Sequence, residues 1–175
     1  MNAAGSIDTA DRVLLRENVT QFLAREARLL DEGQEEEWYG TLDDEYELFI
    51  PIRQATEPRS NEIDRSGYRT KETKAHVRIR LDRLATGMAY SEVPPSRTMR
   101  MVGSIDIEKT DRPDVVAVRS AVLLYRQRGI DPHFDLLPYR RYDTLRSTAE
   151  GLRLLSREII LTEVSLATPN LGLFL

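Results

Sequence analysis

Four side chains of this sequence are candidates for acid–base chemistry: Asp43, Tyr46, His76 and Tyr90. A carboxylate beside a tyrosine can transfer protons when burial and neighbouring groups set the pKa of each. Each candidate also has a structural explanation. Asp43 and Asp44 suit a turn, and Tyr46 suits a core position with its hydroxyl at the rim. His76 lies on a charged stretch, where we expect it to be exposed. The pattern names a candidate site and assigns no reaction to it.

The residue inventory excludes much of the remaining catalytic chemistry. The chain contains no cysteine, and its two histidines are His76 and His133. It cannot form a disulfide, a thiolate nucleophile or a cysteine-based zinc or iron–sulfur site, and two histidines cannot build a three-histidine zinc site. A phosphate-binding glycine loop, a nucleophile elbow and a dinucleotide fingerprint are also absent from the sequence.

Length and composition are typical of one globular domain, which we expect to span residues 1–175. Apolar residues make up 41% and charged residues 31% of the chain. The net charge of −4 makes the chain a poor candidate for nucleic-acid binding. No apolar run approaches the ~20 residues that cross a bilayer, and residues 1–9 do not resemble a signal peptide. We therefore expect a cytoplasmic protein that binds neither nucleic acid nor membrane.

Three stretches of the sequence favour helices. In residues 11–30, apolar side chains recur at spacings of three, four and seven. The acidic residues 31–37 lead into a short helix that would point Trp38 inward. Residues 71–88 fit both a helix and a strand, and we favour a helix because Gly87 stands where a C-cap would be.

Residues 45–53 alternate between the two faces of a strand. Pro51 cannot donate a hydrogen bond to a neighbouring strand, so we expect this strand to lie at a sheet edge or to end there. Residues 54–70 are polar and without period. We expect them to form a long loop that, if ordered, lies against a neighbouring chain.

Four further strands are predicted at residues 99–108, 116–124, 134–146 and 152–166. Short turns join them, so they should form an antiparallel meander. Because the helices precede most of the strands, the sequence predicts an α+β fold. A strongly curved sheet with the first helix across its concave face would bury the apolar surfaces of both.

The C-terminal residues 164–175 carry no charged side chain and end in an apolar pentapeptide. A terminal residue normally frays in water, so an apolar segment of this kind needs a cover. Either it folds into the core of its own chain or another subunit covers it. The sequence leaves both alternatives open.

Several segments, each weak alone, form an ordered set that spans nearly the whole chain. The set resembles the small (β) subunits of aromatic-ring-hydroxylating dioxygenases, the Rieske non-haem iron oxygenases. The Pro-Pro-Ser-Arg run and the Pro-Asn-Leu tail are its most distinctive parts. The segments are residues 22–31 (FLAREARLLD), 37–38 (EW), 46–53 (YELFIPIR), 83–92 (RLATGMAYSE), 94–98 (PPSRT), 157–161 (REIIL) and 168–171 (TPNL).

The resemblance implies a cystatin-like, SnoaL-type cone, in which helices pack into a strongly curved, mainly antiparallel sheet. It implies an α3β3 complex with the β subunits as a trimeric base. The partner α subunit would carry a Rieske [2Fe–2S] cluster and a mononuclear iron. These would receive electrons from NADH through a reductase, a ferredoxin or both. Such a complex adds both atoms of O₂ to an aromatic ring to give a cis-dihydrodiol. This chain would itself hold no catalytic, cofactor or metal site.

Two readings of the chain remain beside that of a structural β subunit. One is a stand-alone SnoaL-like cyclase, dehydratase or isomerase, using Asp43 or His76 with Tyr46 or Tyr90, and the other is a homo-oligomeric binding module. An enzyme needs an open polar pocket in the cone, whereas a structural subunit can fill it with apolar side chains. For the structural subunit, the interface candidates are residues 54–70 together with Trp38, Pro94, Pro95, Arg97, Pro169, Asn170 and Leu171.

Overall fold

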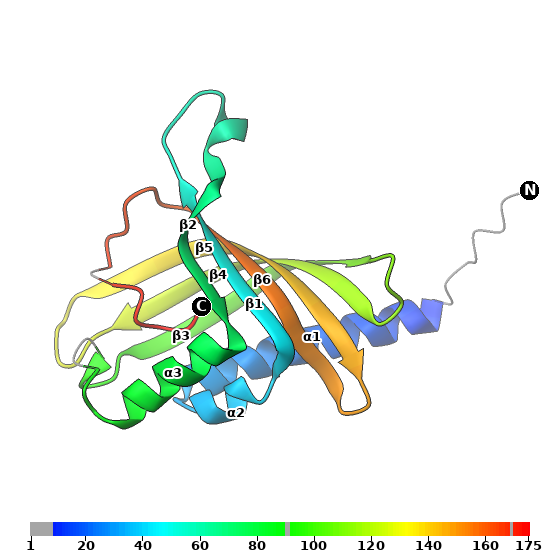
Figure 1. Ribbon diagram of the computed structural model, residues 1–175, viewed down its shortest axis with the longest axis horizontal. Coiled ribbons are helices and arrows are strands. Elements are labelled where there is room, and N and C mark those ends of the chain that lie inside the picture. The colour runs from blue at the N-terminus through cyan, green and yellow to red at the C-terminus, as the bar shows by residue number, and fades with distance from the viewer. Residues whose placement is uncertain (1–8, 90–91, 169) are drawn as a thin grey trace, which may run out of the picture.

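A six-stranded sheet with three helices on one side organises the chain (Figure 1). The structure is a computed structural model that describes residues 9–89, 92–168 and 170–175. The helices are α1 (Thr9–Asp31), α2 (Glu35–Tyr39) and α3 (Lys74–Ala85), with a 3₁₀ turn at Arg59–Asn61. The strands are β1 (Leu42–Arg53), β2 (Ile63–Thr73), β3 (Arg97–Lys109), β4 (Val115–Gln127), β5 (Phe134–Thr148) and β6 (Gly151–Leu161).

The strand order is β2-β1-β6-β5-β4-β3. Strands β3 to β6 form the predicted antiparallel meander. β1 then pairs in parallel with β6, the last strand of the chain, and antiparallel with β2. The sheet is therefore mixed but mainly antiparallel, and the predicted α+β class is confirmed.

Helix α1 lies along the sheet and packs chiefly on β3 and α2. Its buried stripe contains Val19, Leu23 and Leu30, as the spacing predicts, but also the carboxylate of Glu26. The hollow between the curved sheet and the three helices is called the cone interior below. The predicted helix in residues 71–88 is confirmed as α3, and Gly87 follows it with a φ of +69°, which glycine adopts without strain.

Of the two alternatives for residues 45–53, the edge position is wrong, whereas β1 does end at Arg53, two residues after Pro51. β1 lies between β2 and β6, and the register of its pairing with β2 shifts on both sides of Pro51. An irregularity of this kind accommodates a residue that cannot donate a hydrogen bond. β1 also begins at Leu42, so Asp43 and Asp44 lie in a strand and not in the predicted turn.

The long loop predicted for residues 54–70 is also corrected. Residues 63–70 belong to β2, which continues to Thr73 and forms the outer edge of the sheet. Its side chains are exposed or half-buried, so the sequence shows no apolar alternation there. The remaining β1–β2 connection projects beyond the sheet (Figure 1). At the other end of the chain, β6 stops at Leu161 and not at residue 166.

Candidate functional site

The cone interior contains a network of buried charges. Glu26 of α1 accepts hydrogen bonds from Arg141 Nη1 on β5 at 2.9 Å and from Arg157 Nη2 on β6 at 2.8 Å. Arg157 also donates to both carboxylate oxygens of Asp143, at 2.8 and 2.9 Å. The indole of Trp38 donates to the other Glu26 oxygen at 3.2 Å. Two positive and two negative side chains, all almost fully buried, thus neutralise one another.

The pKa values of these groups lie far from neutrality. Burial alone would raise the pKa of Glu26, but the guanidinium groups of Arg157 and Arg141 outweigh it and lower that pKa to about 2. Burial would lower the pKa of Arg157, but Asp143 and Glu26 raise it well above its usual range. Burial raises the pKa of Tyr46. Because general acids and bases work best with a pKa near the working pH, these groups are suited to fixed charge states and not to proton transfer.

Residues 170–175, called the C-terminal segment below, lie across the mouth of the cone. Arginines from four different elements donate to its main-chain oxygens. Of the two alternatives for the apolar end of the chain, the structure shows the intramolecular one, because the side chains of Phe174 and Leu175 are buried in the core of their own chain. The bonds are Arg80 Nη2 to the Gly172 and Leu173 oxygens at 3.2 and 3.0 Å, Arg100 Nη2 to the Phe174 oxygen at 2.6 Å, Arg126 Nη1 to the Asn170 oxygen at 2.9 Å and Arg157 Nη1 to the Leu175 oxygen at 2.9 Å.

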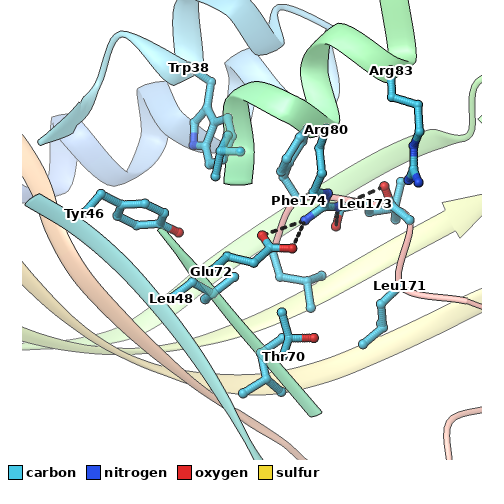
Figure 2. A pocket seen from close by; sticks show the side chains of 14 residues that line it. Trp38, Tyr46, Leu48, Thr70, Glu72, Arg80, Arg83, Leu171, Leu173 and Phe174 are labelled. Atoms are coloured by element: carbon cyan, nitrogen blue, oxygen red, sulfur yellow. Dashed lines mark hydrogen bonds and ion pairs between the residues drawn. The ribbon is translucent and has the colours of Figure 1, made fainter. Parts of the chain in front are cut away.

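The ring of Phe174 lies between Trp38 and Arg80. Its centroid is 4.7 Å from the Trp38 ring and 4.2 Å from the Arg80 guanidinium carbon. A cavity of about 360 Å³ remains beside it, lined among others by Tyr46 and Glu72 (Figure 2). Both Glu72 carboxylate oxygens bind Arg80 Nη1, at 2.9 and 3.0 Å. The carboxylate in this cavity is therefore held in an ion pair.

The structure does not assemble the predicted acid–base candidates into one site. Tyr46 lines the cavity, whereas Asp43 is buried elsewhere and binds Arg146 Nη1 at 2.9 and 3.1 Å. His76 is exposed, as expected, and its Nδ1 accepts from the Thr73 backbone N–H at 3.1 Å, which caps α3. Tyr90 lies outside the described residues.

The predicted interface residues occupy different environments. Trp38 is 1% exposed and belongs to the core of its own chain, so its side chain has almost no surface to offer a partner. Pro94, Pro95 and Arg97 are exposed, and Asn170 and Leu171 are half-buried. Pro169 lies outside the described residues.

Arg126, which the sequence reasoning missed, joins the two proline-containing segments. It donates to Ser96 Oγ at 3.0 Å and pairs with Glu92 on one side. On the other side it donates to Thr168 Oγ1 at 2.7 Å and to the Asn170 carbonyl. The signal was available, because Arg126 falls on the same inward face of its strand as Leu124.

The opposite face of the sheet carries an apolar patch, called the outer patch below. Cross-strand pairing aligns Met99 with Tyr125, and Tyr125 with Leu136. Met101 is 63% exposed, while its neighbour Arg100 points into the cone. Such a contiguous exposed surface is typical of a protein–protein interface. The patch consists of Met99, Met101, Leu123, Tyr125, Phe134 and Leu136.

The described residues contain neither a metal-ligand cluster nor a helix that could span a membrane. Across residues 9–89, 92–168 and 170–175, no three histidine, aspartate or glutamate side chains are grouped as metal ligands would be. Within the same part of the chain, no helix has the length and apolar character needed to span a membrane.

Comparisons with known proteins agree on one family. The model of the family described as the ring hydroxylating beta subunit matches residues 25–167. The N,N-dimethyl phenylurea N-demethylase subunit beta of Sphingobium sp. (strain YBL2) is 38% identical over 172 residues, which are 97% of this chain and 98% of that protein.

Solved structures show the same fold. A chain of naphthalene 1,2-dioxygenase with indole bound in its active site matches with a TM-score of 0.82 and 21% identity, covering 98% of this chain and 89% of that one. The beta subunit of benzoate 1,2-dioxygenase from Burkholderia mallei gives 0.66 and 19%, covering 90% and 92%. An NTF2-like protein with a cystatin-like fold from Novosphingobium aromaticivorans gives 0.58 and 19%, covering 93% and 94%. The predicted cystatin-like cone is confirmed.

Proposed function

The chain belongs to the ring hydroxylating beta subunit family, and we propose that its task is to hold the catalytic α subunits of a multicomponent dioxygenase in their working arrangement. A beta subunit of such an oxidoreductase implies an alpha-subunit partner. The chain is the non-catalytic member of the complex. We assign it an α3β3 assembly in the cytoplasm, with a trimer of this chain as the base.

The iron centres of the proposed complex belong to the α subunit. A Rieske cluster needs two cysteines and two histidines, and a mononuclear iron of this class needs two further histidines and a carboxylate. This chain has no cysteine and two histidines, His76 and His133, which are both exposed. The redox chemistry therefore needs another polypeptide, and electrons would reach it from a reductase, directly or through a ferredoxin.

The C-terminal segment inside the cone is the observation that favours a structural role over a stand-alone enzyme. Phe174 and Leu175 are buried in the core and occupy part of the space that an enzyme would keep open for its substrate, and a cavity of about 360 Å³ remains beside them. The ionisable groups inside are paired in fixed charge states, and Asp43 and His76 do not line the remaining cavity. No arrangement of a poised acid and base supports the cyclase, dehydratase or isomerase alternative among the described residues.

We assign the outer patch to self-association. In a stable trimer, each chain contributes a surface that remains buried against its neighbours. The interfaces of homo-oligomers contain more apolar area than transient interfaces do. The exposed Pro94, Pro95 and Arg97, with Asn170 and Leu171, then remain for the α subunit, together with the projecting β1–β2 connection. Arg126 fixes the relative position of the two segments that carry these residues.

Two reactions are candidates for the whole complex. We propose cis-dihydroxylation of an aromatic ring, in which both atoms of O₂ enter the product. The second candidate is oxidative N-demethylation, which the name of the 38% identical relative favours. Turnover of naphthalene, benzoate and a dimethyl phenylurea under ¹⁸O₂ distinguishes them, since only the first reaction places two labelled oxygens on the ring and only the second releases formaldehyde.

Co-expression with a large-subunit gene of this family tests the structural role. We expect the tagged chain to copurify with an iron-containing partner, and the chain alone to contain no stoichiometric iron and to convert no substrate. The double variant M101D/L123D should stay folded but lose the trimer, while Ile79→Asp, an equally exposed position on α3, should keep it. Iron bound to the isolated chain, or turnover by it, would refute the proposal.

A further inference from the structure

The C-terminal segment lies in the cone in the manner of a bound ligand. It forms neither helix nor strand. Its main-chain oxygens at residues 172–175 are instead bound by the guanidinium groups of Arg80, Arg100 and Arg157. Guanidinium groups in fixed positions recognise oxygen acceptors by geometry. The three arginines bind the segment through its main-chain oxygens, so these contacts do not depend on most of its side chains.

Phe174 makes the most specific of these contacts. The residue is 7% exposed, and its ring has Trp38 of α2 on one side and Arg80 of α3 on the other. Its carbonyl oxygen accepts from Arg100 of β3 at 2.6 Å. Three side chains from three elements thus recognise an aromatic ring and an oxygen acceptor next to it.

The site is larger than the segment that occupies it. The cavity of about 360 Å³ continues past the ring toward Tyr46, Thr70 and Glu72 (Figure 2). Tyr46, Thr70 and the Arg80–Glu72 ion pair give this space polar walls, whereas Leu48 and Val77 add apolar surface. A hollow that combines apolar walls with a few convergent polar groups is typical of a small-molecule site.

We infer that the cone contains a binding site for an aromatic ring bearing an adjacent carbonyl or carboxylate oxygen, and that the C-terminal segment occupies this site in cis. Because the segment is tethered, its effective concentration is on the order of millimolar, and it keeps out weaker free ligands. A ligand of the same chemistry binds when the ring of Phe174 is removed or the segment is detached. The site is a binding site and not a catalytic one.

The test uses the full-length chain with Phe174→Ala, which leaves a ring-sized space between Trp38 and Arg80. The loss of the ring also weakens the hold on residue 174, so that a ligand oxygen can displace the main-chain oxygen of this residue from Arg100. A dry apolar cavity of this size can bind a free aromatic molecule. We expect phenylacetate to raise the melting temperature of the variant saturably, more than phenylacetamide does, and toluene least, while the wild type does not respond. Trp38 is the sole tryptophan of the chain, so its fluorescence reports occupancy directly.

Two matched variants control this test. Leu145→Ala opens an apolar space at a buried position that does not line the cavity, and it should show no preference for phenylacetate. Adding Arg100→Gln to Phe174→Ala should weaken phenylacetate binding by about tenfold or more, because it removes the charged donor that binds the ligand oxygen. Toluene binding should be unchanged. A folded Phe174→Ala variant that ignores all three probes, or binds them in the same order as Leu145→Ala, would overturn the inference.

A second experiment leaves Phe174 in place and covers the case in which its variant does not fold. A specific protease site is inserted between Val164 and Ser165, which are exposed, and the folded full chain is cut there. We expect the released piece to stay bound and to exchange with a labelled peptide of residues 165–175, but not with a scrambled peptide. Loss of the piece without rebinding, or equal binding of the scrambled peptide, would show that the segment is not a ligand.

Discussion

The two faces of the β3–β6 sheet each depart from the usual distribution of charge in one region. The face toward the helices is mainly apolar but also buries Arg141, Asp143 and Arg157, whereas the face toward solvent exposes the outer patch. In most folded chains, charged side chains are rarely buried and large apolar patches are rarely exposed. The buried charges find their partners within the chain, whereas the outer patch has none among the described residues and, in the function proposed above, is covered by another copy of the chain.

The largest effect should come from breaking the inner charge network. Glu26→Gln leaves the buried Arg141 and Arg157 with Asp143 as the one remaining carboxylate of the network, so one positive charge is uncompensated, and we expect a loss of about 3–5 kcal/mol in the free energy of unfolding. Urea denaturation measures it. Glu17→Gln, on the exposed side of the same helix, is the control and should unfold as the wild type does. Equal stability of both variants would mean that the network contributes nothing.

Acid should break the same network reversibly. The pKa of Glu26 is lowered in the folded chain to about 2, from a usual value of 4.5. Its contribution to the free energy of unfolding, roughly 3 kcal/mol, is therefore fully present above pH 4.5 and is lost as the pH falls toward 2. Unfolding free energies measured between pH 6 and 2 should show this fall for the wild type. In Glu26→Gln this component should be missing, and an identical fall in the variant would contradict the assignment.

A pair of phenylalanines compares the two faces directly. Phe174→Ala removes a ring buried in the cone and should cost about 3 kcal/mol. Phe134→Ala removes an exposed ring that stacks on Tyr125, and should cost less than about 1 kcal/mol in the isolated chain. In the assembled complex, the difference between the two variants should become smaller or change sign. The outer patch is then covered, so the loss of the Phe134 ring lowers the stability of the oligomer. Calorimetry of the isolated chain and of the complex tests both statements.

The smallest expected difference in stability is between variants of two arginines of α3, one facing the cone and one at the surface. Arg80 is mostly buried, pairs with Glu72 and holds the C-terminal segment, so Arg80→Gln should cost about 1–2 kcal/mol. Arg78 pairs with Glu36 and Asp82 at the surface, and Arg78→Gln should leave the melting temperature unchanged within error. If the two variants behaved alike, the segment would not depend on Arg80.

The sequence predicted the elements whose burial is periodic. Helix α1 and strands β4 to β6 follow the apolar spacing closely, since each has one mainly apolar face in the core, whereas β3 exposes Met99 and Met101 and buries Arg100. β2 was missed because it is an edge strand whose side chains are exposed or half-buried, and β1 supplies its hydrogen bonds. β1 was placed at an edge because the sequence shows Pro51 but not the irregular pairing that accommodates it.

The candidate site was predictable only through the resemblance, and then only in part. Alternation in β3 shows that Met99 and Met101 share a face opposite Arg100, but a local pattern cannot tell which face is covered by another chain. The inward direction of Arg126 and Arg157 could have been read from their apolar neighbours. Their partners could not, because residues 168–175 and Glu26 are distant in sequence and meet them only in the folded chain.

The parallel contact of β1 with β6 sets the order in which the molecule can be completed. The two strands are about a hundred positions apart, with Leu48 beside Arg157. During synthesis, β1 leaves the ribosome early with one side unpaired and must wait for the final strand before that side is closed. The nascent chain therefore exposes an unpaired strand edge, which is prone to aggregation, for most of its translation. We expect slowly translated codons or the lack of a chaperone to lower the yield of this subunit more than a loss of thermodynamic stability would.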